Sequence, residues 1–135
     1  PSVEATYGSL RRAPLHIAKA RINVLGAIEN LFWAVVDSSQ AALMAAKQAP
    51  PSPENIPEYL DQVFVRTRRL DKKYIDYFNE IYELYHSINR GNLKAIPGKE
   101  VDDHIDKVIE FEKVLRNITV DLVKEEKMTR IEVKK

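Results

Sequence analysis

The sequence contains no cysteine, which excludes disulfide bonds and thiolate metal sites. This absence fits a reducing compartment, so we expect a cytoplasmic protein. The four glycines are scattered, so no glycine-rich phosphate loop is present. The longest apolar run, residues 31–36, is too short to cross a bilayer. We therefore expect a protein that works away from membranes, without a cofactor.

Charge of one sign is also missing. The 135 residues carry a net charge of +1, so no global field draws the chain to nucleic acid or membrane, and any such binding must be local. An apolar fraction of 44% is typical of one globular domain that can bury a core. The chain opens at Pro1 with a polar stretch, so we expect a piece of a longer protein that begins with a linker.

The segment Pro50–Pro57 holds four of the seven prolines. Proline has no backbone N–H and clashes with the preceding helical turn, so no helix continues through this segment. Ser52 and Asn55 are suitable N-caps, and Pro53 and Pro57 suit a first helical position. The segment predicts a rigid corner between two helices.

Apolar residues recur at steps of three and four on both sides of this corner, as a helix face requires. The pattern predicts a very long first helix over 14–47, a short helix over 56–67, a third from Asp71 to Gly91 and a fourth over 99–127. Short connections favour antiparallel neighbours. We therefore expect an all-α fold, an up-and-down four-helix bundle, with a fifth short helix as a variant.

This fold divides the chain into three parts. Residues 1–13 are expected to form a polar leader or linker, and residues 14–127 the bundle. In the tail, residues 128–135, the stretch 130–134 alternates between polar and apolar side chains like a strand but has no visible partner. We expect it to be disordered or to add an edge segment.

Catalytic and metal-binding motifs are weak. Glu83 and His86 have the Glu-x-x-His spacing of di-iron bundles, but a di-iron site needs two such motifs and further carboxylates. No Gly-x-Ser-x-Gly elbow occurs. We therefore predict no catalytic residues and no metal ligands.

The densest charge lies between the second and third predicted helices, where residues 66–73 include five basic side chains. Such side chains can bind phosphates, and nearby tyrosines can stack on bases. The candidate nucleotide- or phosphate-binding residues are Arg66, Arg68, Arg69, Lys72, Lys73, Tyr74 and Tyr77. The alternative is a solvated turn whose charges favour the end of the second helix. Both interpretations stay open.

The order of these features resembles a known family. A long first helix ends in SQAALMAA (39–46), a proline-containing link follows, IPEYL (56–60) opens a short helix, and YIDYF (74–78) begins an aromatic helix before a long last one. From about residue 18 to residue 122, the chain resembles the HEPN (higher-eukaryote and prokaryote nucleotide-binding) domains that are associated with minimal nucleotidyltransferases.

The resemblance implies a prokaryotic or archaeal-like helical bundle that forms a homodimer. It also implies partnership with a nucleotidyltransferase domain or subunit and contact with a nucleotide or RNA. Some members are ribonucleases with an Arg followed after four to six residues by His, late in the bundle. Neither Arg90 nor Arg116 has a histidine in range. The formal match Arg11–His16 is expected to lie before the first helix and contains Pro14, so we set it aside.

The sequence leaves three functions open. The first is a non-catalytic nucleotide-binding or accessory module that works with a nucleotidyltransferase. The second is a metal-independent ribonuclease that uses His86 or His104 as acid or base beside an arginine. The third is a structural bundle that mediates assembly.

Overall fold

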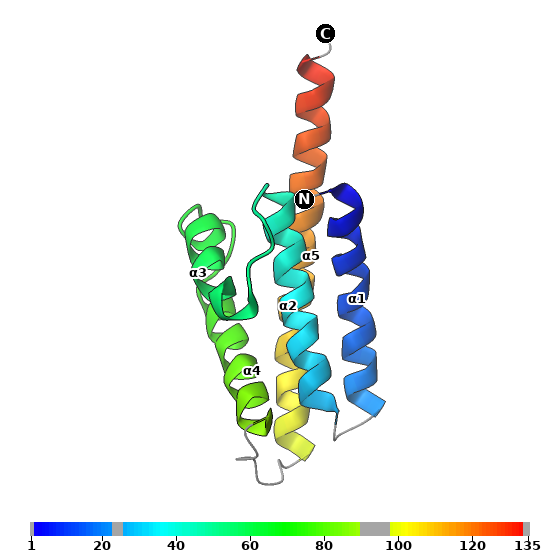
Figure 1. Cartoon of the computed structure of the whole chain (residues 1–135), viewed down its shortest axis with the longest axis vertical. Coiled ribbons are helices and arrows are strands. Elements are labelled where there is room, and N and C mark those ends of the chain that lie inside the picture. The colour runs from blue at the N-terminus through cyan, green and yellow to red at the C-terminus, as the bar shows by residue number, and fades with distance from the viewer. Residues whose placement is uncertain (1, 23–25, 90–97, 134–135) are drawn as a thin grey trace.

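The chain is all-helical in the computed structural model, which describes residues 2–22, 26–89 and 98–133 (Figure 1). Within these ranges there is no strand. Four longer helices run roughly along one axis, each opposite in direction to the one before: α1 (Val3–Ile22), α2 (Ala27–Ala45), α4 (Lys73–Asn89) and α5 (Gly98–Val133). The short segments between α2 and α4 lie beside one end of this group.

The prediction of one first helix over 14–47 is wrong. The chain forms two helices, α1 and α2, which lie side by side and contact each other extensively. Gly26 stands at the N-cap of α2, as suits a residue with low helix propensity. Two packed helices bury apolar surface that a single long rod would expose, and this gain outweighs the uninterrupted apolar pattern.

The prediction of a polar leader is also wrong, because residues 3–13 belong to α1. Thr6, Ser9 and Ala13 are buried there. Small side chains of this kind allow close approach of another helix without adding to the hydrophobic signal of the sequence. Pro14 lies inside α1 rather than at its first turn. Its side chain is exposed, so the ring faces solvent instead of the core.

The proline corner forms as predicted between two helices. After Ser52, a 3₁₀ turn η1 (Pro53–Asn55) leads into α3 (Ile56–Leu60), with a proline in the first turn of each. Ser52 and Asn55 occupy the cap positions, but neither side chain makes a capping hydrogen bond. The helix then widens into a π-helical turn, η2 (Asp61–Val65), so the predicted helix over 56–67 is less regular than expected.

The later helices match their predicted starts more closely than their ends. Asp71 accepts the backbone N–H of Lys73 at 2.9 Å, as its predicted capping role requires. The predicted stop at Gly91 lies outside the described residues. The tail prediction is wrong, because α5 continues through residues 128–133. Extending an existing helix adds one hydrogen bond per residue, so a short alternating pattern does not stop it.

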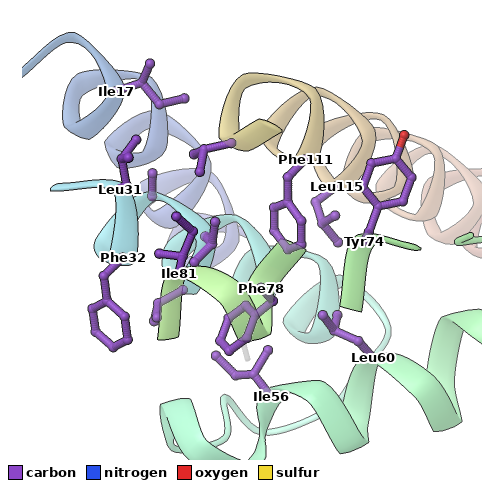
Figure 2. Packing of buried hydrophobic residues seen from close by; sticks show 14 of the residues in the cluster. Ile17, Leu31, Phe32, Ile56, Leu60, Tyr74, Phe78, Ile81, Phe111 and Leu115 are labelled. Atoms are coloured by element: carbon purple, nitrogen blue, oxygen red, sulfur yellow. The ribbon is translucent and has the colours of Figure 1, made fainter. Parts of the chain in front are cut away.

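The core lies between α2, α4 and α5, with α3 covering one side (Figure 2). Its largest fully buried side chains include Phe64, Phe78 and Phe111. α2 contacts α5 more extensively than it contacts α4, although α2 and α5 run in the same direction. In a square bundle only antiparallel neighbours touch, so α2 would contact α4 more extensively than α5. α2 is therefore the central helix.

Candidate functional site

The predicted basic residues lie on the turn between η2 and α4, which we call the basic turn (residues 66–73). The backbone reverses here because the N–H groups of Arg69 and Leu70 both donate to the carbonyl of Phe64, at 2.8 and 3.1 Å. Arg68 has a left-handed φ of 64°. Leu70 is buried and anchors the turn to the core. The charged side chains of the turn are therefore presented from a fixed backbone.

Two of the arginines are held by ion pairs. Arg66 Nε lies 3.1 Å from Asp61 Oδ2, one turn earlier in η2. Arg69 Nη2 donates to both carboxylate oxygens of Glu125 on α5, at 2.9 Å each. A carboxylate bound through both oxygens fixes the guanidinium in position as well as neutralising it. Arg69 therefore fastens the basic turn to α5.

Lys73 is also paired. Its Nζ lies 3.6 Å from Glu110 Oε1 on α5 and 5.2 Å from the centre of the Tyr74 ring. The charge of Glu110 raises the pKa of Lys73. This lysine therefore stays charged and joins the start of α4 to α5.

Arg68 and Lys72 differ from these three residues. Both are exposed, and neither forms an ion pair with any residue that the structure describes. The five basic residues of the turn therefore separate into three that are paired with acids and two that are not.

The two tyrosines also separate. Tyr74 is only 7% exposed and packs edge-on against Phe111, with ring centres 6.3 Å apart. Burial and the nearby charge of Glu110 raise the pKa of its hydroxyl. Its ring is therefore part of the core and is not presented for stacking on a base. Tyr77 is half-buried, with Lys107 Nζ 5.4 Å from its ring centre.

A second polar cluster joins α1 to α2. Asp37 on α2 is buried, and its Oδ2 lies 3.1 Å from His16 Nε2 and 3.5 Å from Arg12 Nε. Arg12 also donates to Ser9 at 2.9 Å. Asp37 was not predicted from the sequence. Its signal was an acidic residue directly after a long apolar run, where burial requires a partner.

The three histidines are half-buried. His16 Nδ1 and His104 Nδ1 are buried without a hydrogen-bond partner among the described residues. The ring of His86 lies 4.3 Å from that of Tyr82. The Arg11–His16 spacing lies inside α1, not before the first helix as predicted, and His16 turns toward Asp37.

Other features of the described residues give little further chemistry. One shallow depression on α5 is lined by Asp106, Lys107, Ile109, Glu110 and Lys113. No three potential metal-binding side chains gather in the described ranges. Within these ranges, every helix is too short or too polar to cross a membrane.

Comparison of the chain with protein-family models, with curated proteins and with solved structures finds no match. Function must therefore be inferred from the residues themselves.

Proposed function

We propose that this chain is a cytoplasmic, non-catalytic module of the HEPN kind, with an up-and-down arrangement of its four longer helices. It binds phosphate groups of a nucleotide or RNA at the basic turn and assists a nucleotidyltransferase domain or subunit. The observation that carries this proposal is the pair Arg68 and Lys72, which are exposed on a fixed turn without acidic partners among the described residues. Unpaired cations of this kind attract phosphate at little structural cost.

A titration with fluorescently labelled single-stranded RNA and with ATP tests the binding part of this proposal. Binding should weaken as salt rises, because bound phosphates release their counterions. If neither the RNA nor ATP binds at low salt, the binding part of the proposal is refuted. The partnership is tested separately, by co-purifying the chain with the nucleotidyltransferase encoded beside it, if the gene neighbourhood contains one.

Self-association is part of the same proposal. Phe32 on α2 is 3% exposed and stacks on Tyr85, with 4.0 Å between the ring centres. Trp33 remains 38% exposed. An exposed tryptophan is a common anchor at interfaces. Light scattering should show a dimer at high micromolar concentration, and Trp33→Ala should shift it toward monomer.

A ribonuclease is the second candidate, since Arg12 and His16 meet at Asp37. The geometry opposes a nuclease role, because Nε2 of His16 pairs with Asp37 and Nδ1 is buried, so neither ring nitrogen faces a substrate. RNA cleavage that His16→Ala abolishes would favour this candidate. A purely structural bundle is the third, and the ion pairs of Arg66, Arg69 and Lys73 fit it equally well.

A further inference from the structure

Among the residues that the structure describes, two other than glycine have a left-handed backbone, and they differ in what their side chains do. Lys47 follows α2 with φ 66°, and Arg68 follows η2 with φ 64°. This conformation brings Cβ close to the following carbonyl and is unfavourable for an L-residue, whereas glycine adopts it freely. For stability alone, glycine would be the better residue at both positions.

Lys47 has a structural reason to be there. Its Nζ lies 2.7 Å from Glu126 Oε1 and so links the end of α2 to α5. Arg68 has no corresponding contact, since its exposed side chain forms no hydrogen bond or ion pair with the described residues. Strain at a residue that does not support the fold is a recognised sign of a functional role. The adjoining π-helical turn η2 points the same way, because such turns are frequent at functional sites.

Lys72 is the second exposed cation of the basic turn without an acidic partner among the described residues. The intervening Arg69 and Leu70 are both anchored, the first by Glu125 and the second by the core. Arg68 and Lys72 are therefore held at the two ends of an anchored segment.

Building on the proposed function, we propose that Arg68 and Lys72 alone contact phosphate, and that the ligand is the backbone of single-stranded RNA rather than a free nucleotide. Neither residue lines the shallow depression on α5 or a second one on α1, which is lined by Glu4, Tyr7 and Arg11. An exposed turn suits a chain of phosphates that passes over it, whereas a single nucleotide needs a concave site to bury its base. Arg66, Arg69 and Lys73 hold the turn in shape.

The test compares variants that remove the same charge from different places. Arg68→Gly and Lys72→Ala should each weaken binding of a labelled single-stranded RNA about tenfold at low salt. Together they should reduce the slope of log affinity against log salt by about 1.4, since each phosphate contact contributes about 0.7 on a single strand. ATP should compete poorly for the same site.

The matched control is a cation outside the basic turn. Lys124 is exposed on α5 and forms no ion pair with the described residues. Lys124→Gln removes one positive charge and should bind RNA within about twofold of the unaltered chain if contacts rather than total charge decide affinity. If Lys124→Gln weakens binding as much as Arg68→Gly, binding follows the total charge of the chain and the assignment is overturned.

Stability provides an independent readout. Arg68→Gly should raise the urea midpoint, because it relieves the left-handed backbone, while it weakens RNA binding. Lys47→Gly should raise the midpoint less, because it also removes the pair with Glu126. A lower midpoint for Arg68→Gly would show that the arginine supports the fold and would overturn the inference from strain.

The outcomes distinguish the two proposals. If the chain binds RNA and Arg68→Gly with Lys72→Ala does not change the affinity, this assignment fails while the proposed function stands. If ATP binds as tightly as RNA, the RNA part of the assignment fails. If neither probe binds, both proposals fail.

Discussion

α2 and α4 are similar in length but contribute to the core in different ways. α2 buries 15 of its 19 residues, many of them Ala and Ser. The described side chains of α4 that are buried are Tyr74, Phe78 and Ile81, which lie on one face. α2 is thus surrounded by other helices, whereas α4 lies at the edge and closes the core with large rings.

This difference shows two ways of stabilising a small helical core. The central helix depends on small side chains that allow α1 and α5 to come close, and so it has little room for added volume. The edge helix depends on the surface buried by a few aromatic rings. The edge helix should therefore be sensitive to loss of side-chain volume, and the central helix to added volume.

The largest effect should come from removing a ring from α4. Phe78 is fully buried and lies 6.4 Å from Phe111 and 6.3 Å from Tyr82 between ring centres. Phe78→Ala should lower the free energy of unfolding by about 3–5 kcal/mol, measured by urea denaturation. Asn79→Ala, on the exposed side of the same helix, is the control. Equal effects at the two positions would contradict the placement of the core.

Adding volume to α2 should have the next largest effect. Ala42 is fully buried in the central helix. Ala42→Leu should lower the free energy of unfolding by about 1–3 kcal/mol, because the neighbouring helices must move apart. Ala5→Leu on the exposed side of α1 should change it by less than about 0.5 kcal/mol. A stabilised Ala42→Leu would mean that α2 is not tightly enclosed.

A smaller effect should appear at the edge helix at high pH. The pKa of Tyr74 is raised in the folded chain, first by burial and then by Glu110. A raised pKa means that the contribution to stability is complete below the unfolded pKa, about 10, and is lost as the pH rises through the folded value. Tyr74→Phe should therefore lose less stability than the unaltered chain as the pH rises above about 10. If the stability of the two chains falls in parallel with pH, the loss does not come from ionisation of Tyr74.

The smallest effect should appear at the end of α2 at low pH. The pKa of Glu126 is lowered, first by its hydrogen bond with Lys47. A lowered pKa gives stability that is present above the unfolded pKa and lost as the pH falls through the folded value. The unaltered chain should be slightly more stable than Lys47→Met near pH 7, and the two should converge below about pH 4. A difference that persists in acid would point to packing instead of charge.

The same difference between central and edge helices explains what the sequence could predict. α4 was located well, because its apolar residues face one side and Asp71 caps its start. The boundary between α1 and α2 was missed, because a helix that is buried on most sides has no polar face to mark its limits. The small buried residues Thr6 and Ser9 likewise give no apolar signal.

For the candidate site, the sequence predicted which residues belong to it but not how they are arranged. The sequence located all five cations of the basic turn, but the acids that hold three of them could not be assigned from spacing. Glu125 lies 56 residues from Arg69, and Glu110 lies on another helix from Lys73. Such pairs depend on how helices dock. Only the folded arrangement of the helices separates the cations that are paired with acids from those that are free to bind a ligand.

The length of α5 has a mechanical consequence. The C-terminal turns of this helix project past the ends of α1 and α2, and Figure 1 shows no other described helix beside them. Such a helix is a cantilever, clamped where Lys47 and Arg69 meet Glu126 and Glu125. A slight tilt at the clamp becomes a larger displacement at the tip, and a load on the tip is returned to the clamp as torque. The basic turn lies at that clamp, so binding of an RNA strand there would be coupled to the direction in which α5 points.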